Sequence, residues 1–207
     1  MRFTFPERFF VTGTDTGVGK TFVCALLACG LDAYYWKPVQ SGALNGLDSV
    51  FVREMGGIGK EKIIPETYVL GPPFSPHLAA EMETTRVELE LINHHDKPGP
   101  LIIEGAGGVM VPLNDDSLII DLIESMALPV LIVALNRLGV INHTLLTIEA
   151  LRKANICVLG VILNQAVNND NKRAVEHYGN TDVLAQIEQM DSLTPTGFKE
   201  KFYELFL

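Results

Sequence analysis

The chain has 207 residues, of which 47% are hydrophobic and 20% are charged, and its formal net charge is −9. This length predicts one domain spanning residues 1–207, and the composition is that of an ordinary soluble globular protein. The negative charge argues against non-specific nucleic-acid binding and against docking on anionic membranes, and no apolar run approaches transmembrane length. Cys24, Cys29 and Cys157 lack metal-ligand spacing and are expected to be buried thiols of a reducing compartment. We therefore expect a cytoplasmic protein.

Predicted strands and helices alternate along the chain. Apolar runs predict strands at residues 8–13, 33–37, 101–104, 130–135 and 157–164. Helices are predicted at residues 20–29, 47–55, 85–94, 118–125 and 141–153. Continuous apolar runs are typical of strands covered on both faces, so this alternation predicts an α/β fold with a doubly wound, mostly parallel sheet flanked by helices. Ligands bind such sheets beyond the C-terminal ends of the strands.

A glycine-rich segment joins the first predicted strand to the first predicted helix. It ends in six residues typical of a phosphate-binding P-loop: Gly17, Val18, Gly19, Lys20, Thr21 and Phe22. In such a loop, backbone N–H groups and the helix N-terminus hold a polyphosphate, the lysine reaches the β- and γ-phosphates of ATP, and the threonine binds Mg²⁺. The strict pattern has a glycine where this chain has Thr14, and the nearest earlier glycine is Gly13. A plain glycine turn capped by Thr21 is the alternative interpretation.

Three polar residues follow the second predicted strand. Lys37 stands at the strand end and is either a solvated surface lysine or a second cation aimed at the phosphate site. Ser41 could donate to an anionic substrate group or could be a turn residue. Asp48 opens the next predicted helix, where it either complements the helix dipole or binds Mg²⁺, which takes one or two carboxylates in phosphoryl-transfer sites.

The third predicted strand ends in an acid, Glu104, in the manner of a Walker B strand. A buried glutamate without a partner would be costly, so this position predicts a metal ligand. Gly105, Ala106 and Gly107 follow it, and the small residues would let the backbone pass close to a bound ligand.

Later strand ends offer weaker signals. Gly139, Val140, Ile141 and Asn142 enter a predicted helix, whose N-terminus either holds a carboxylate or is an ordinary cap. Asn164 could read a base edge with its amide or could be a turn residue. The pair at positions 94–95, both histidines, is interpreted as solvated.

The motifs, in this order along residues 8–165, resemble those of the dethiobiotin synthetase family. The segments that carry the resemblance are GTDTGVGKT (13–21), KPVQSG (37–42), SPH (75–77), EGAGG (104–108) and LGVINH (138–143). The resemblance implies a P-loop NTPase-like ligase of biotin synthesis that converts 7,8-diaminopelargonic acid (7,8-diaminononanoate), CO₂ and ATP, with Mg²⁺, into dethiobiotin. It also implies a carbamate that attacks the γ-phosphate, a carbamic–phosphoric mixed anhydride, and ring closure by the second amine.

The resemblance further implies roles for individual residues. Lys37 and Lys20 would be catalytic, and Thr21, Asp48 and Glu104 would bind Mg²⁺. The nucleotide would be held by the P-loop, by residues 104–107 and by Asn164, which would read adenine. Substrate contacts would come from Thr16 and Ser41, and from residues 139–142 of the opposite subunit of a homodimer.

The chain departs from the family pattern at three places. Gly17 is often glutamate in relatives, Gln165 is often aspartate, and the tail after residue 179 shows no recognisable form of the proline-containing loop that packs on adenine. These departures concern base recognition more than phosphate chemistry.

Two other classes of P-loop protein compete with this interpretation. Cobyrinate-amidating enzymes usually carry a glutaminase domain, for which 207 residues leave no room. The main alternative is a deviant-Walker ATPase switch of the partitioning or placement type. Such switches have an additional lysine early in the P-loop, whereas residues 11–16 contain none.

Overall fold

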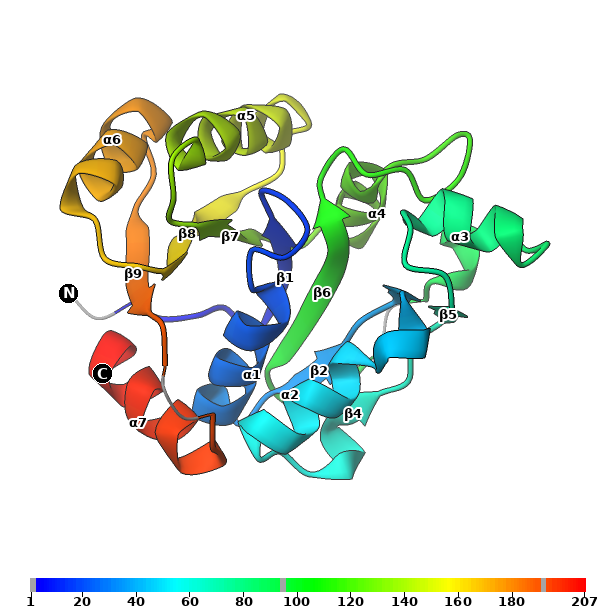
Figure 1. The fold of residues 1–207 in the computed structure, drawn as a ribbon, viewed down its shortest axis with the longest axis horizontal. Helices are drawn as coiled ribbons and strands as arrows, with labels where there is room; N and C mark the ends of the chain where they lie inside the picture. Colours follow the sequence, from blue (N-terminus) through cyan, green and yellow to red (C-terminus); the bar gives the residue numbers. More distant parts are fainter. Residues whose placement is uncertain (1–2, 94–95, 191–192) are drawn as a thin grey trace.

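The computed structural model describes residues 3–93, 96–190 and 193–207, and its centre is a seven-stranded sheet (Figure 1). The strand order is β4-β2-β6-β1-β7-β8-β9, and neighbouring strands are parallel. These strands are β1 (Arg8–Gly13), β2 (Tyr34–Trp36), β4 (Ile63–Ile64), β6 (Leu101–Gly108), β7 (Val130–Leu135), β8 (Val158–Gln165) and β9 (Val183–Glu188). Strand β1 lies between β6 and β7, where the order reverses, and this is the position at which ligands bind in open α/β sheets.

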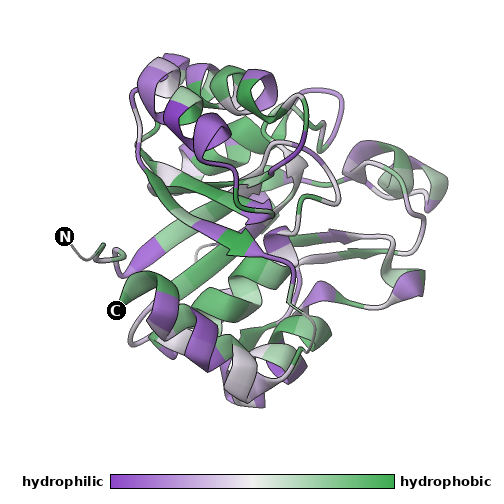
Figure 2. Cartoon of the chain, turned by 60° about the vertical axis from the view of Figure 1, so that its left-hand side comes forward, coloured by the Kyte–Doolittle hydropathy of each residue, from purple (hydrophilic) through white to green (hydrophobic). Residues whose placement is uncertain are grey.

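Helices cover both faces of the sheet (Figure 1). One face carries α1 (Lys20–Leu31), α2 (Asp48–Gly56) and α7 (Pro195–Phe206), and the other carries α4 (Ile119–Met126), α5 (Val140–Lys153) and α6 (Asn169–Gly179). Successive side chains of a strand point to opposite faces, so Phe9 of β1 packs in the α1 cluster and Phe10 in the other. Figure 2 shows hydrophobic residues concentrated on the central strands and polar residues on the outer helix faces.

The structure confirms the predicted doubly wound parallel sheet. The predicted strands 8–13 and 130–135 coincide with β1 and β7, and the predicted helices 20–29, 47–55, 118–125 and 141–153 lie within a few residues of α1, α2, α4 and α5. Continuous apolar runs correctly indicated these strands because both faces of each strand are buried. Strand β6 continues through Gly108, beyond the predicted end at Glu104, with a shift in its register against β1 between Val11 and Gly13.

The predicted helix at residues 85–94 is wrong. Its described part is irregular apart from a 3₁₀ turn, η3 (Leu89–Leu91), and residues 94–95, including the two histidines interpreted as solvated, lie outside the described residues. The backbone makes its hydrogen bonds elsewhere: Glu88 N donates to the Tyr68 hydroxyl at 3.0 Å, and Asn114 Nδ2 donates to the Val87 carbonyl at 2.6 Å. Tertiary partners have replaced the i to i−4 bonds that a helix would need.

A small unit that the sequence analysis did not predict lies beside the main sheet. It consists of the two-stranded parallel sheet β3 (Val39–Ser41) and β5 (Tyr68–Leu70), the helix α3 (Pro76–Met82) and the turn η1 (Ala43–Asn45), whereas the turn η2 (Lys60–Lys62) leads directly into β4 of the main sheet. Figure 1 places it at the β4 side of the molecule, beyond the C-terminal end of β2. It therefore adds a wall to the edge of the sheet where ligands are expected.

The C-terminal residues complete the core. Strand β9 adds an edge to the sheet, and α7 packs on α1 through Phe198, Phe202 and Phe206, which are buried.

The expectation of three buried cysteines holds for Cys24, whereas Cys29 is half-buried and Cys157 is exposed. Within the described ranges, no helix has the length and apolar character needed to cross a membrane.

Candidate active site

The loop between β1 and α1 has the backbone of a phosphate-binding P-loop. Gly17 and Gly19 have φ angles of +76° and +94°, in the left-handed region that favours glycine. Gly19 is the N-cap of α1, so Lys20 and Thr21 form the first helical residues and their N–H groups lack intrahelical partners. The helix N-terminus and its free N–H groups make this loop suited to bind an anion.

Gly13 replaces the first glycine of the strict P-loop pattern. A Cβ atom at this position would lie 2.8 Å from Val18 Cγ2 and 3.0 Å from Lys20 Nζ. The loop therefore closes tightly over residue 13, which only glycine fits, although the sequence spacing is longer by one residue. Lys20 is 7% exposed and its Nζ donates to the Asp15 carbonyl at 3.0 Å.

The buried residues Lys37 and Glu104 form a charge cluster with the half-buried Asp48 next to Thr21. Lys37 Nζ contacts Asp48 Oδ2 and lies 3.0 Å from Glu104 Oε1. Thr21 Oγ1 lies 3.0 Å from Asp48 Oδ2 and 2.9 Å from Glu104 Oε1. The end of β2, the start of α2, the start of α1 and strand β6 thus bring four predicted site residues together.

The cluster sets the charge of both lysines. Burial by itself would lower the pKa of Lys37, but the carboxylates of Glu104 and Asp48 raise this pKa well above its ordinary value, so Lys37 is a fixed cation. Burial lowers the pKa of Lys20, and repulsion from Lys37 adds to this effect while Glu104 opposes it. The two lysines therefore line the same site in different electrostatic environments, one with a lowered pKa and the other with a raised pKa.

A cavity of about 780 Å³ opens over this cluster. Its walls come from the P-loop, from Lys37 after β2, from the start of α2, from β6 and from the small β3–β5 unit. The lining residues are Thr16, Gly17, Gly19, Lys20, Thr21, Lys37, Gln40, Ser41, Gly42, Asn45, Gly46, Asp48, Pro73, Phe74, Ser75, Pro76, Glu104, Ala106, Gly107 and Val111. Most of the predicted site residues thus line one cavity, together with a wall from residues 73–76.

Two neighbouring polar side chains of the cavity wall, Ser41 and Gln40, differ in their hydrogen bonding. Ser41 Oγ is buried and has no hydrogen-bond partner in the described part of the chain. Gln40 Oε1 accepts from the backbone N of Asp48 at 3.1 Å, and its Nε2 donates to the Ser41 carbonyl. Gln40 thereby satisfies the first N–H of α2, whose N-cap residue, Leu47, makes no side-chain capping bond. A buried unpaired hydroxyl is costly, so the Ser41 hydroxyl is available to a bound molecule.

The oxygen atoms of the charge cluster suit a magnesium ion. Thr21 supplies a hydroxyl, and Asp48 and Glu104 supply carboxylates, which are the hard ligands that Mg²⁺ takes together with phosphate oxygens and water. Among the described residues, no group of three or more His, Cys, Asp or Glu side chains could hold a metal ion. A magnesium site here would therefore depend on Thr21 and on a nucleotide as well as on the two acids.

Several predicted site residues lie away from the cavity wall. Gly105 faces the Phe10 ring, where a Cβ would approach to 2.7 Å. Asn164 is 4% exposed and its Nδ2 donates to the Val18 carbonyl at 3.0 Å, so this amide braces the P-loop. Val18 is buried, and Phe22 packs against Phe198.

The predicted carboxylate-binding segment stands at the start of α5. Gly139 is the N-cap with a φ angle of +96°, followed by Val140, Ile141 and Asn142 in the first turn. None of the four lines the cavity over the P-loop. Within one chain, the structure therefore does not bring this helix N-terminus to the charge cluster.

Sequence reasoning missed Tyr35, Gln40 and the wall formed by Pro73 and Phe74. Tyr35 OH donates to Glu104 Oε2 at 2.8 Å from a fully buried position. In the sequence, Tyr35 looks like one more apolar residue of a buried strand, and Gln40 lies in a strand that was not predicted. Neither residue therefore stands in a local pattern that indicates a functional site.

The fold and the site together define a P-loop nucleoside triphosphatase. A glycine-rich loop between the switch-point strand and a helix, a lysine at its end and an acid on the adjacent strand are the features of that class. A family model described as an AAA domain matches residues 7–196.

Curated relatives identify the family. An ATP-dependent dethiobiotin synthetase of Paramagnetospirillum magneticum is 46% identical over 185 residues, which cover 89% of this chain and 89% of that protein. One of Rhodopseudomonas palustris is 41% identical over 199 residues, covering 96% and 94%. The biotin biosynthesis bifunctional protein BioCD of Bordetella avium is 47% identical over 187 residues, which make up 90% of this chain and 40% of that protein. The chain belongs to the ATP-dependent dethiobiotin synthetase family of ligases.

Solved structures of low sequence identity show the same fold. A ParA family ATPase of Chlorobium tepidum has a TM-score of 0.55 at 13% identity and covers 97% of this chain and 90% of its own. The MinC:MinD cell division complex of Aquifex aeolicus has a TM-score of 0.57 at 14% identity, covering 95% and 86%. This likeness concerns the fold alone, whereas the relatives above share 41–47% of their aligned residues with this chain. The switch-ATPase alternative is therefore the less well supported function.

Proposed function

We propose that this chain, acting as a single domain, uses ATP to carboxylate 7,8-diaminopelargonic acid with CO₂ and to close its ureido ring, giving dethiobiotin. The observation that carries the proposal is the cavity lined by both the P-loop lysine, Lys20, and a second buried cation, Lys37, which shares Glu104 Oε1 with Thr21. Family membership supports the choice of substrates. A cytoplasmic location accords with this reaction.

The chemistry requires cations and positioning rather than a covalent enzyme group. One amine of the substrate takes up CO₂ as a carbamate, and a carbamate oxygen attacks the γ-phosphorus while ADP leaves. The second amine then attacks the carbonyl carbon of the mixed anhydride, and phosphate leaves as the ring closes. Lys20 and the loop N–H groups would hold the phosphates, and Lys37 would stabilise charge between carbamate and γ-phosphate. Magnesium, when bound, supplies further positive charge at the phosphates.

Product analysis tests the proposed reaction directly. The full chain is incubated with the diamine, ¹³C-bicarbonate, Mg²⁺ and ATP, and the products are measured by mass spectrometry and by ADP assay. We expect labelled dethiobiotin and ADP in equal amounts, with little ADP formed when the diamine is left out. Steady ATP hydrolysis that the diamine does not stimulate, without labelled product, would instead support a switch ATPase.

We expect Thr21, Asp48 and Glu104 to share one Mg²⁺. Glu104→Gln and Asp48→Asn each remove one negative charge from the cluster while keeping its shape, so each variant should need a higher Mg²⁺ concentration for half-maximal activity. Loss of one carboxylate charge should weaken the binding of a dication that prefers such ligands. An unchanged Mg²⁺ dependence in both variants would refute the shared site.

A homodimer would bring the α5 N-terminus of one subunit to the cavity of the other. Support comes from the apolar surface beside that helix start, where Leu138 is fully exposed and Met110 and Leu146 are 62% and 61% exposed. Met110 and Leu146 line a second hollow with His143. Exposed apolar groups clustered in this way are typical of interaction surfaces.

Hybrid dimers test this shared site. Gly139→Asp would place a carboxylate where the substrate carboxylate binds, and a Cβ at residue 139 meets only His143, at 3.6 Å. Lys37→Ala and Gly139→Asp chains should each be inactive alone. Mixed and allowed to exchange subunits, they should regain activity, because one of the two sites in a hybrid is intact. Gly139→Asn is neutral and carries the same backbone strain at a φ of +96°, so it is the matched control and should retain more activity. A fully active monomer would contradict the proposal.

We expect only loose selection of ATP over other nucleoside triphosphates. Asn164 is the one residue proposed to contact the base, and its amide already donates an N–H group to the Val18 carbonyl. A single amide–base pair contributes roughly 1–3 kcal/mol of discrimination, which is about tenfold to a hundredfold for most of that range. The measurement is kcat/KM for ATP, GTP and CTP at equal free Mg²⁺. A preference for ATP above about a thousandfold would mean that other residues contact the base.

A further inference from the structure

Tyr35 contacts the acid of the charge cluster from the side that faces away from the cavity. Glu104 Oε1 faces Thr21 and Lys37, at 2.9 and 3.0 Å, whereas Glu104 Oε2 accepts the Tyr35 hydroxyl at 2.8 Å. The Tyr35 and Glu104 side chains are both fully buried. Each oxygen of this carboxylate therefore has its own set of partners.

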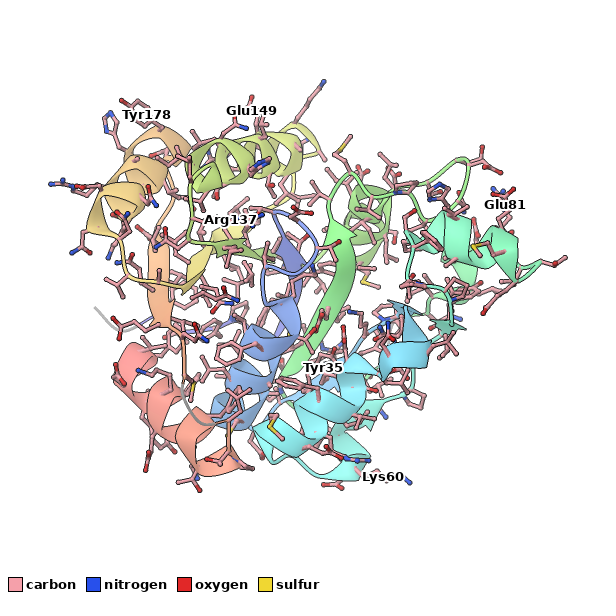
Figure 3. All side chains as sticks on the ribbon, viewed as in Figure 1. Tyr35, Lys60, Glu81, Arg137, Glu149 and Tyr178 are labelled. Carbon is pink, nitrogen blue, oxygen red and sulfur yellow. The ribbon has the colours of Figure 1, made fainter. Side chains whose placement is uncertain are left out.

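The strand register places Tyr35 where its phenol can reach Glu104. Tyr35 of β2 is paired with Ile102 of the neighbouring parallel strand β6, two residues before Glu104. Residues two apart in a strand point to the same face, so Tyr35, Ile102 and Glu104 all face α1. Figure 3 shows Tyr35 in the interior, where α1 and α2 cover the sheet.

The phenol acts as a donor of fixed direction. Tyr35 is fully buried, and its hydroxyl proton is directed at Glu104 Oε2, which lies 2.8 Å from the phenol oxygen. A buried phenol needs a partner for that proton, and Glu104 Oε2 is the acceptor that the structure supplies.

We propose that Tyr35 is a positioning residue, whose hydroxyl holds the Glu104 carboxylate so that Oε1 is presented to Thr21, Lys37 and a bound magnesium ion. Without this bond, the carboxylate could rotate about its last side-chain torsion, which has broad energy wells. Mutation of a residue that hydrogen-bonds a metal ligand typically weakens metal affinity by about tenfold to a hundredfold. This inference rests on the proposed role of Glu104 as a magnesium ligand.

The test is Mg²⁺-dependent binding of a non-hydrolysable ATP analogue, measured by isothermal titration calorimetry without turnover. Tyr35→Phe keeps the buried ring and removes only the hydroxyl. We expect the Mg²⁺ concentration for half-maximal binding to rise about tenfold to a hundredfold. A purely structural role would lower the melting temperature and leave this concentration unchanged.

Two controls make the outcome specific. Tyr68→Phe removes a phenol whose hydroxyl bonds Glu88 N in the small β3–β5 unit, and it should leave the Mg²⁺ concentration unchanged. In a Glu104→Gln background, Tyr35→Phe should add little further change, because it acts through Glu104. If Glu104→Gln shifts the Mg²⁺ dependence and Tyr35→Phe does not, the positioning role is overturned and the proposed function stands. If neither variant shifts it, the magnesium role of Glu104 fails as well.

Discussion

Replacing Lys37 by alanine is expected to reduce kcat by about a hundredfold to a thousandfold, the range for removal of one preorganised electrostatic donor. Lys37 is 5% exposed and is held as a cation between Asp48 and Glu104. It is therefore already charged and placed when the carbamate and the γ-phosphate meet, and no solvent has to reorganise around it. The measurement is single-turnover and steady-state formation of dethiobiotin, with the Kd for ATP determined separately.

Two variants separate the catalytic loss from a loss of stability. Lys37→Ala leaves the buried Glu104 carboxylate with less compensation, so the melting temperature should fall as well. Lys37→Arg keeps a positive charge beside both acids and should recover stability but only part of the turnover, since a planar guanidinium does not replace a compact ammonium. Near-normal turnover in folded Lys37→Ala would overturn the catalytic assignment.

Replacing Lys20 by alanine is expected to cause a loss of similar size in kcat/KM, roughly 3–4 kcal/mol of transition-state stabilisation. The loss in Lys20→Ala should have a different origin from the loss in Lys37→Ala, because Lys20 belongs to the loop that holds the phosphates and Lys37 does not. We expect a higher Kd for ATP in Lys20→Ala, whereas the Kd should change little in Lys37→Ala. Equilibrium binding of ATP and kinetics at saturating ATP distinguish the two.

Lys60 provides the matched surface control for both lysines. It is exposed in the turn η2, on the far side of α2 from the P-loop (Figure 3). Lys60→Ala removes the same group and the same formal charge, and it should leave both kcat and ATP affinity unchanged. Equal losses in Lys60→Ala and Lys20→Ala would mean that net charge, and not the position of Lys20, is responsible.

Much of the fold could be predicted because the relevant signals are local. Strands β1 and β7 are continuous apolar runs, and such runs are buried on both faces regardless of their neighbours. The prediction failed at residues 85–94, where apolar residues alternate at 87, 89 and 91 and the backbone bonds to Tyr68 and Asn114. The small β3–β5 sheet was missed because its strands are three residues long and each pairs only with the other.

The sequence by itself indicated most of the candidate site residues. The P-loop, Lys37 and Glu104 stand out because glycine spacing and strand ends are visible in short stretches, and parallel strands end at a common edge. Asp48 stands out as the acid that opens a helix, and the family resemblance chose between the alternative roles of Lys37 and Asp48. The tertiary structure decided what each residue contacts. It placed Lys37 between two acids, Asn164 against Val18, and Tyr35 behind Glu104, 69 residues away in the chain. Contacts over such separations depend on strand register and on the packing of buried side chains, and no local pattern of residues carries that information.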